Sequence, residues 1–581
     1  MKKVAMKRVV ALLLLFVTLS VSLCSCKVDM DDMGAIIPMY IASPQMDLDP
    51  TEMIYDKDFL KVSGLLYAGL TQVNKSGKIE YVLASDWEQK YNADREEYFL
   101  YIDLISTRWN DGRTFTADHV VYAWKRILSP ETASPAAALL YDLKNARDVK
   151  AGVMTIDDLG VAAVDADTVE VQFERPIDPE LFLEAISSPA LVPLRDDVIQ
   201  GKEEIWSTNV NDIATNGHFA IKKMDPEGEY RLDFSKYFRL PKTPEDGYNV
   251  YVKPYQLVTN FSWVPSAADA ITQFDNKEIY YVGSFTSDTY NAKEKDIESS
   301  DTLTSYTYFF DCENEVLADA RVRKALSIAL DREQIASIIG LGSKAANGFV
   351  ADIATGSTMK KSFRKEAGAV YSTKADSAAQ SLLSQAGVTS GSFEITYRED
   401  REYDVLVAEY AKGVWEALGF TVSLKGLGVN SYEKALYAGE FDVIALDYQG
   451  LSTNPYSFLA PFSPAYSGSV VSVDATSSGI APHVTAYNSE AYTALLDQIL
   501  EETTRSGRHA KLIELEKLFA EECPATAMVF YSHNYLASSD LKGLDVSPYG
   551  YTIFADAVLK DYKERNEDYL AKVEALLGEA Q

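Results

Sequence analysis

Cysteine and histidine are scarce in this sequence of 581 residues, which contains only four cysteines and five histidines. Cys24 and Cys26 lie at the N-terminus, so only Cys312 and Cys523 remain for the rest of the chain. Two cysteines exclude a disulfide framework and a cysteine-based metal site, although these two could pair with each other outside the cell. The histidines are scattered and form no His-Glu-x-x-His motif, so we predict no metal site and no cofactor.

Positive charge is also scarce, because 86 acidic residues outnumber 55 Lys and Arg residues and give a net charge of −31. Such a surface is repelled by phosphate backbones, so we exclude nucleic acid as a partner. The sequence has no Gly-x-Ser-x-Gly elbow and no phosphate-binding loop. One Ser-x-x-Lys pattern at Ser357 and Lys360 is too short to indicate a serine nucleophile, so no enzymatic function is predicted.

The N-terminus has the pattern of an export signal, since four basic residues precede an apolar run from Val9 to Leu23. At ~1.5 Å per residue this run is too short for the ~30 Å hydrocarbon core, so we predict that residues 1–25 are a signal peptide. Leu23-Cys24-Ser25-Cys26 resembles a bacterial lipobox, which implies lipidation of Cys26 and a tether over residues 26–43. An ordinary cleaved signal with incidental cysteines is the alternative.

The rest of the chain is too long for one hydrophobic core, so we expect two or three lobes. Strand and helix patterns alternate, which indicates an α/β fold. Alternating apolar residues predict a strand over Thr168–Glu174, and apolar residues at helical spacing predict one helix over Asp319–Ile338. The C-terminal segment from Asp556 to Gln581 is predicted to be a helix that docks on the body.

A β-α-β unit is predicted in the second half of the chain. Its parts are a strand over Phe393–Tyr397, a helix over Asp404–Leu418 and a strand over Phe420–Leu424, which implies parallel pairing. A helix around 432–437 and a strand over Phe441–Leu446 follow. Asp447 is thereby placed at the carboxyl end of a strand, where ligands of open α/β sheets collect.

One long motif runs from Trp109 to Arg126, where an Asn-Asp-Gly turn precedes a helix with Thr116 at its N-cap. Val120, Trp124 and Ile127 fall on the buried face of that helix, so the motif is structural. Shorter motifs lie at 48–50, 66–70, 83–87, 215–219 and 321–326, with others up to 481–496. In this order the segments resemble the extracellular solute-binding proteins of the oligopeptide and dipeptide importers.

The resemblance implies a class II, cluster C periplasmic-binding-protein-like fold. Two α/β lobes would close over a ligand cleft, and an additional lobe would pack at the side. The implied ranges are 27–67, 194–305 and 534–581 for lobe one, 68–193 for lobe two, which is the extra lobe, and 306–533 for lobe three. The chain crossings near 305 and 533 would form the hinge.

The resemblance further implies the function and the partners. The protein would be a monomer that captures oligopeptides by lobe closure and delivers them to the permease subunits of an ABC importer, whose ATPases are cytoplasmic. Its place would be the extracytoplasmic face of the bacterial membrane, attached through the lipid at Cys26. The alternatives are another solute in the same fold, such as a sugar, a metal chelate or a signalling peptide, or a surface-anchored hydrolase.

Ligand-binding residues are implied by the same resemblance. Peptide-binding relatives hold an extended peptide through main-chain hydrogen bonds and neutralise its α-ammonium with an aspartate that precedes a tyrosine. Asp447 and Tyr448 fit that pair, and Asn454 is the alternative position for the anchor. The other implied pocket residues are Tyr432, Phe309, Gly283 and Ser284.

Overall fold

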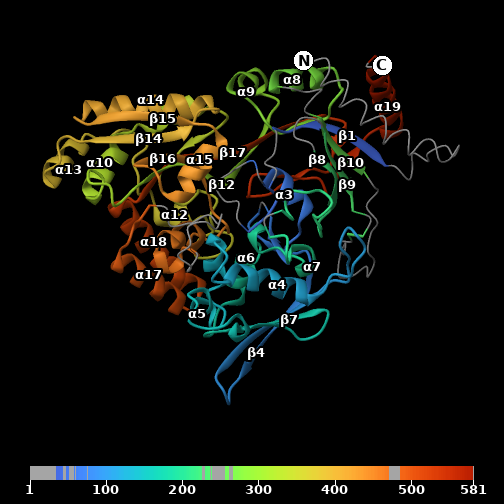
Figure 1. The fold of residues 1–581 in the computed structure, drawn as a ribbon, viewed down its shortest axis with the longest axis horizontal. Coiled ribbons are helices and arrows are strands. Elements are labelled where there is room, and N and C mark those ends of the chain that lie inside the picture. The colour runs from blue at the N-terminus through green and yellow to red at the C-terminus, as the bar shows by residue number, and fades with distance from the viewer. Residues whose placement is uncertain are drawn as a thin grey trace.

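The computed structural model describes residues 34–42, 47–51, 58, 60–74, 76–203, 205–224, 229–235, 237–238, 255–260, 266–469 and 485–579. The predicted signal peptide and Cys26 lie outside these residues. Within them, no helix is both long enough and apolar enough to span a membrane. Three groups of elements surround a central crossing of two strands, as Figure 1 shows.

The two crossing strands are the longest in the structure, β12 (Glu298–Phe310) and β17 (Ala525–Ala537). They pair antiparallel with each other, and both belong to one eleven-stranded sheet of the described chain. On the lobe-one side the sheet continues through β11 (Tyr281–Val282), β1 (Ala35–Tyr40), β10 (Tyr255–Asn260), β9 (Glu229–Phe234) and β8 (Phe219–Met224). The predicted crossings near 305 and 533 thus lie inside β12 and β17.

On the lobe-three side the sheet continues through β16 (Val443–Gln449), β14 (Ser392–Arg398) and β15 (Thr421–Leu427). Helix α14 (Glu402–Ala417) connects β14 to β15, and these two strands are parallel, which confirms the predicted β-α-β unit. Helix α15 (Val429–Ala438) leads to β16. The prediction for β16 was wrong in extent, because Asp447 lies inside the strand opposite Tyr306 and not beyond its end.

The single helix predicted over Asp319–Ile338 is two helices in the structure. These are α10 (Ala320–Ala329) and α11 (Arg332–Ile339), separated by Leu330, whose backbone is extended. The Asp331 side chain accepts a hydrogen bond from the Gln334 N–H, 3.0 Å away, and caps the second helix. A strong N-cap therefore interrupts the apolar periodicity.

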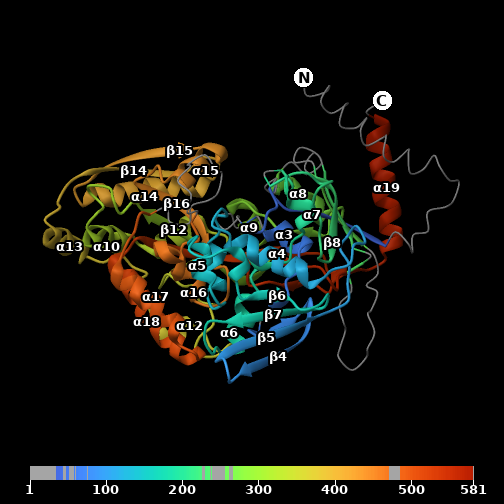
Figure 2. The same ribbon diagram turned by 60° about the horizontal axis from the view of Figure 1, so that its bottom comes forward.

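Lobe two contains a four-stranded antiparallel sheet in the order β4 (Ala84–Asn92), β5 (Glu97–Leu104), β7 (Thr168–Phe173) and β6 (Val161–Ala163). Strand β7 alternates between buried and half-buried residues as predicted. Helix α4 (Ala117–Leu128) begins after Thr116 and buries Val120, Trp124 and Ile127, which confirms the structural interpretation of that motif. The sheet lies at the bottom centre of the molecule in Figure 2.

The predicted tether over residues 26–43 is too long, because Ala35–Tyr40 form strand β1. Strand β1 is parallel to β10 and β11, and Ile37 is fully buried in the sheet, because the sequence from Ala35 to Tyr40 is mostly apolar. The C-terminal helix α19 (Tyr562–Glu579) packs beside β1, as predicted. The Asn566 amide donates to the Gly34 carbonyl and accepts from the Ile36 N–H.

Cys312 and Cys523 form no disulfide. Burial raises the pKa of the Cys312 thiol to about 12 and that of the Cys523 thiol to about 11. Both thiols are therefore protonated and unreactive at neutral pH. The pairing that the sequence left open is absent in this structure.

Candidate functional site

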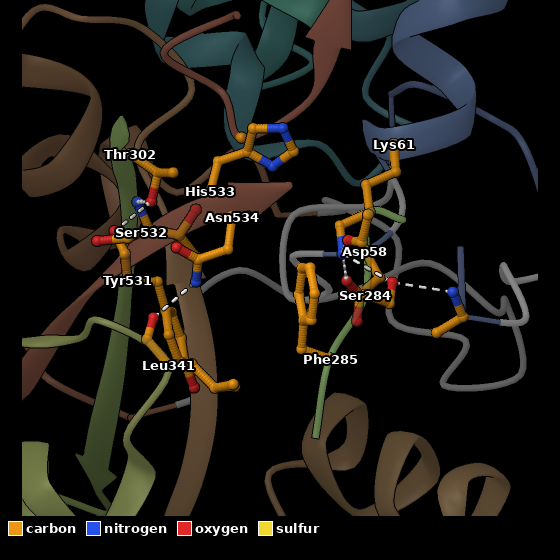
Figure 3. A pocket seen from close by; sticks show the side chains of 14 residues that line it. Asp58, Lys61, Ser284, Phe285, Thr302, Leu341, Tyr531, Ser532, His533 and Asn534 are labelled. Carbon is orange, nitrogen blue, oxygen red and sulfur yellow. Dashed lines mark hydrogen bonds and ion pairs between the residues drawn. The ribbon is translucent and has the colours of Figure 1, made fainter. Parts of the chain in front are cut away.

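A cavity of about 140 Å³ lies where lobe one meets the crossing strands. One wall comes from lobe one and the other from β12, β17 and the loop that contains Leu341 (Figure 3). The labelled residues of the first wall are Asp58, Lys61, Ser284 and Phe285. Those of the opposite wall, on β12, β17 and the Leu341 loop, are Thr302, Leu341, Tyr531, Ser532, His533 and Asn534. The predicted Gly283 and Ser284 thus line a cavity between lobes.

Lys61 organises the lobe-one wall from helix α3 (Leu60–Leu66). Its ammonium lies 2.7 Å from Asp58 Oδ1 and donates to the Gly283 carbonyl, 2.9 Å away, and to Ser284 Oγ, 3.2 Å away. Ser284 Oγ also accepts from the Ala42 N–H at 2.9 Å. A Cβ on Gly283 would lie 2.7 Å from the Tyr281 ring, so this position requires glycine. An ion pair therefore fixes the backbone that faces the cavity.

The wall opposite is polar but carries no charge on its β17 residues. Asn534 Nδ2 donates to the Leu341 carbonyl at 2.6 Å, and Asn534 Oδ1 accepts from the Ser299 hydroxyl at 2.5 Å. His533 Nε2 lies 2.8 Å from Thr552 Oγ1. Burial lowers the pKa of His533 to about 3, so its imidazole is neutral at physiological pH.

A second cavity of about 640 Å³ is lined by residues from all three of the predicted lobe ranges. Its volume falls in the range of ~300–1,000 Å³ that small-molecule sites occupy. Ser300 and Asp301 line this cavity, whereas Thr302 and Thr304 line the first one, so the two follow each other along β12. Lobe two contributes residues near Asn74, and lobe three contributes the segments 347–365 and Thr453.

Asp447, the predicted ammonium anchor, is 1% exposed and lines neither of these cavities. Its Oδ2 accepts from Arg401 Nη1 at 2.9 Å, and its Oδ1 accepts from the Tyr531 hydroxyl at 2.7 Å. Tyr531 lines the first cavity and so lies between that cavity and the carboxylate. The structure thus gives Asp447 an internal cationic partner.

The predicted pocket aromatics lie in the core. The Tyr448 hydroxyl donates to the Phe458 carbonyl at 2.8 Å, and its ring centroid lies 5.6 Å from that of Phe309. The Tyr432 hydroxyl donates to the Ala445 carbonyl at 2.6 Å. All three predicted aromatics are at most 5% exposed. Of the six predicted site residues, the structure brings only Gly283 and Ser284 to the cavities described here.

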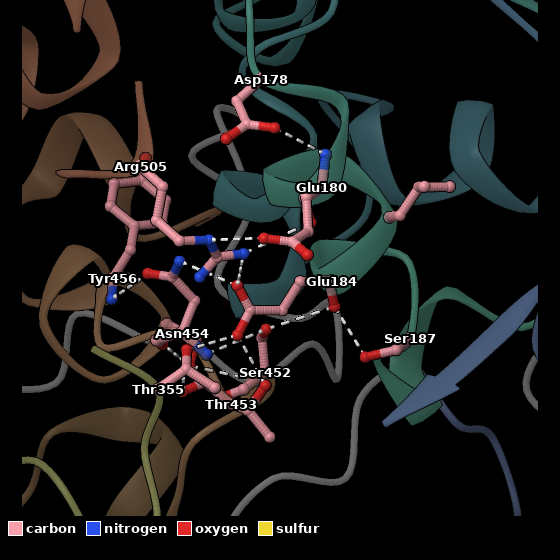
Figure 4. Close-up of polar contacts among 12 residues, drawn as sticks. Asp178, Glu180, Glu184, Ser187, Thr355, Ser452, Thr453, Asn454, Tyr456 and Arg505 are labelled. Atoms are coloured by element: carbon pink, nitrogen blue, oxygen red, sulfur yellow. Dashed lines mark hydrogen bonds and ion pairs between the residues drawn. The ribbon is translucent and has the colours of Figure 1, made fainter. Parts of the chain in front are cut away.

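Asn454, the alternative anchor, belongs to a polar cluster between lobes two and three (Figure 4). Its amide donates to Glu184 Oε2 at 3.2 Å. Glu184 belongs to helix α6 (Pro179–Ala185) and is fully buried, and it also accepts hydrogen bonds from Thr355, Thr453 and Arg505. Asn454 therefore has a structural role at a lobe contact.

The Ser-x-x-Lys pattern forms no nucleophile–base pair. The Ser357 hydroxyl donates to Glu366 Oε1 at 2.8 Å and accepts from Lys361 Nζ at 3.1 Å. Desolvation alone would raise the pKa of Glu366, but the hydrogen bonds from Lys361 and Ser357 lower it to about 2, so Glu366 is a poor base. Lys360 instead lines the second cavity.

Sequence reasoning missed Lys61, the β17 residues and the segment 360–365 as parts of these cavities. The segments lie hundreds of residues apart in the chain, and no local periodicity connects them. A weak signal existed for 360–365, because its sequence Lys-Lys-Ser-Phe-Arg-Lys is strongly basic within an acidic chain.

Residues 78–469 match the family described as "Bacterial extracellular solute-binding proteins, family 5 Middle", which covers more than half of the chain. The chain is 27% identical over 519 residues to the periplasmic murein peptide-binding protein MppA of Escherichia coli, covering 87% of this chain and 90% of that protein. It is 24% identical over 509 residues to the oligopeptide-binding protein OppA of Bacillus subtilis, covering 85% and 87%.

Solved structures share the fold. Listeria monocytogenes OppA bound to peptide matches with a TM-score of 0.72 at 21% identity, covering 90% of this chain and 99% of that one. Escherichia coli MppA matches with a TM-score of 0.72 at 24% identity, covering 90% and 98%. The unliganded open form of MppA gives only 0.58 at 24% identity, covering 91% and 98%.

Proposed function

The chain belongs to family 5 of the bacterial extracellular solute-binding proteins, and we propose that it captures peptides outside the cell and delivers them to the permease of an ABC importer. As a member of this family it is a binding component of transport and not an enzyme. The family and the class II, cluster C fold expected from the sequence are confirmed. The permease would work with cytoplasmic ATPases.

The two cavities along β12 carry this proposal. Both border β12, and the first also borders β17; these strands would connect lobe one to lobe three. An extended peptide satisfies its main chain by strand-like hydrogen bonds, and the first cavity places strands β12 and β17 beside the space that a peptide would fill. MppA is a murein peptide-binding protein, Bacillus subtilis OppA is an oligopeptide-binding protein and Listeria monocytogenes OppA is bound to peptide, which supports a peptide over other solutes.

The arrangement of the lobes supports capture by closure. The same relative, MppA, gives a TM-score of 0.72 in one structure and 0.58 in its unliganded open form. The lower score for the open form supports a change in the arrangement of the lobes between two states of this fold. A ligand that bridges the lobes stabilises the closed state at the expense of the open one, and the importer would recognise that state.

Asp447 remains our proposed partner for the peptide α-ammonium, which would have to compete with Arg401 for this carboxylate. A buried carboxylate needs a cationic partner, because leaving it unpaired costs several kcal/mol. The Asp447→Asn variant should lose affinity for peptides with a free amino group and keep its affinity for N-acetylated ones. Equal losses for both peptides, measured by calorimetry, would argue for another anchor.

Lipid anchoring at Cys26 is part of the proposal and rests on the sequence pattern. Two or more acyl chains hold a protein on a membrane stably. Wild-type protein expressed in bacteria should sediment with membranes, whereas the Cys26→Ala variant should appear in the soluble extracytoplasmic fraction. Identical fractionation of both proteins would contradict the anchor and leave peptide capture untouched.

Peptide capture is tested by thermal unfolding of the mature chain with a mixed tripeptide pool. A ligand present at 100 times its Kd stabilises the folded state by about 2.7 kcal/mol, which raises Tm. A pool of free sugars at the same concentration is the control and should leave Tm unchanged. An unchanged Tm with every peptide pool would refute peptide capture.

A further inference from the structure

A cluster of buried charged groups lies in lobe three, where the first turn of helix α14 meets the sheet. Arg401 is the N-cap residue of α14, and the Asp404 N–H donates to the Arg401 carbonyl at 3.0 Å. Asp447, on β16, accepts from Arg401 Nη1 at 2.9 Å and from the Tyr531 hydroxyl at 2.7 Å. Tyr531 lines the first cavity, so a continuous series of contacts joins that cavity to the interior of lobe three.

The cluster contains two carboxylates but only one cation that pairs with either of them. Asp404 and Asp447 are both 1% exposed, and Arg401 pairs with Asp447. The neighbouring Arg398 pairs with Asp400 instead, at 3.0 and 2.6 Å. With both buried carboxylates ionised, Arg401 would leave one negative charge unpaired, which is unfavourable away from water. Asp404 is therefore the carboxyl group that retains a proton in this arrangement.

The surroundings of Asp404 agree with this assignment. Burial raises the pKa of Asp404 to about 7 and Asp447 adds to the shift, while Arg401 and Arg398 oppose it. The other titratable side chains near this carboxyl group are tyrosines on four elements, namely Tyr306 and Tyr308 on β12, Tyr403 on α14, Tyr432 on α15 and Tyr531 on β17. Asp404 is thus the group of this cluster whose charge changes near neutral pH.

Arg401 has a second acceptor within its own helical turn. The buried Oδ1 of Asp404 has no hydrogen-bond partner among the described residues. A guanidinium offers five N–H donors in a planar fork, so Arg401 can serve a carboxylate other than Asp447. Asp404 lies three residues after Arg401, and its unsatisfied oxygen would gain a partner if Arg401 left Asp447.

We propose that Asp404 is a positioning residue for peptide capture, which takes over Arg401 from Asp447 when the peptide α-ammonium binds and releases one proton as it does so. This inference rests on the proposed pairing of Asp447 with the ammonium. The ammonium brings one positive charge into the cluster, and the proton that leaves Asp404 for solvent removes one. The net charge of the cluster is therefore zero before and after binding, and every buried charge keeps a partner.

Proton release makes capture depend on pH. Asp404 has a pKa of about 7 without peptide, and Arg401 beside it would lower this pKa in the complex. Affinity is therefore lowest in acid, rises as the pH approaches 7 and levels off above it. Between pH 5 and pH 6, where the ammonium of a peptide stays protonated, the Kd should fall about tenfold for one released proton.

The test is calorimetric titration with a tripeptide that has a free amino group and neutral side chains, and with its N-acetylated form. Each titration is run at pH 5 and pH 6 in two buffers of different ionisation enthalpy, so that the difference in heat counts the protons released. Wild type should release about one proton at pH 5 with the free-amino peptide, because Asp404 is fully protonated there. The N-acetylated peptide brings no ammonium and should release none.

Two variants locate the proton. Asp404→Asn should bind the free-amino peptide as wild type does at pH 5, release no proton and gain no affinity at pH 6. Glu409→Gln is the matched control, because it removes an exposed carboxylate from the same helix, and it should match wild type throughout. Melting curves without peptide check that both variants are folded.

Free-amino peptide that binds wild type without proton release would overturn the inference and leave peptide capture intact. Equal proton release by Asp404→Asn, or by wild type with the N-acetylated peptide, would also overturn it, because another group would then titrate. The wild-type proton count needs no variant and so decides the matter even where Asp404→Asn does not fold. If wild type binds neither peptide, the proposed function itself fails and the inference falls with it.

Discussion

The contact between lobes two and three and the junction along β12 are both built from charged and polar residues. They differ in whether those residues have hydrogen-bond and ion-pair partners within the protein. At the contact, Asp142 and Arg508 form a bidentate pair with distances of 2.7 and 2.6 Å, and Glu184 accepts four hydrogen bonds while fully buried. At the junction, Lys360 and Lys365 line a cavity without a protein partner among the described residues.

This difference separates polar groups that are paired within the protein from polar groups that face a cavity. A buried charge is tolerated only when it is paired and hydrogen-bonded. Removing one partner at the contact between lobes two and three should therefore destabilise the fold, because the other charge stays buried and unpaired. Unpaired cations are tolerated where water reaches them, as at an open cavity. Disrupting the first region should therefore reduce stability, and disrupting the second should reduce binding.

The largest effect on stability is expected at the contact between lobes two and three. Glu184→Gln leaves the Arg505 guanidinium buried without its carboxylate, so the free energy of unfolding should fall by about 3–5 kcal/mol. Denaturant unfolding measures this change. Glu180→Gln is the matched control, because Glu180 also faces Arg505 but its side chain is 51% exposed, and it should cost less than about 1 kcal/mol. Similar losses in both variants would remove the distinction between the regions.

A pH effect of intermediate size is expected from Asp404, whose Oδ1 is buried without a hydrogen-bond partner in the described part of the chain. Burial raises the pKa of Asp404 to about 7, while Arg401 opposes the shift and Asp447 adds to it. Because the folded pKa exceeds the unfolded value of about 3.9, the contribution of Asp404 to stability is largest below about pH 4 and is lost as the pH rises to about 7.

The Asp404→Asn variant should flatten this fall, by a few kcal/mol between pH 5 and pH 8, in melting curves across that range. Asp400→Asn is the control of opposite sign, because Arg398 lowers the pKa of Asp400, so this group contributes stability above its unfolded pKa. Parallel curves for wild type and Asp404→Asn would show that Asp404 titrates normally.

A smaller effect on stability is expected at the lobe-one wall of the first cavity. Lys61→Met removes the hydrogen bonds that hold Gly283 and Ser284, so we expect a loss of about 1 kcal/mol in stability. Peptide affinity should fall about tenfold, because the backbone that faces the ligand loses its support. Calorimetry measures the affinity, with Lys293→Gln, which breaks the distant pair with Asp275, as the control. Unchanged affinity would exclude this wall from the binding site.

The local spacing of apolar residues in the sequence predicted much of the fold and little of the candidate site. Strand β7 and the β14-α14-β15 unit were predictable, because their buried residues recur at the period of the element. The break at Asp331 was missed because apolar periodicity outweighed a readable N-cap. The cavities were not predictable, since their walls come from distant segments that only the tertiary fold brings together.

The placement of Asp447 shows the limit of a local argument at the site. The sequence put this residue at the end of a strand, where an open sheet binds ligands, but the strand continues through it. Arg401, at the N-cap of α14, then reaches its carboxylate from a separate element. No spacing rule in the sequence connects these two residues.

Native mass spectrometry of the purified mature chain with a mixed tripeptide pool tests the central claim most directly. The account predicts one intact peptide bound per chain, recovered unchanged after acid release. Chains that carry no peptide in that experiment, or that release peptide fragments, would contradict it.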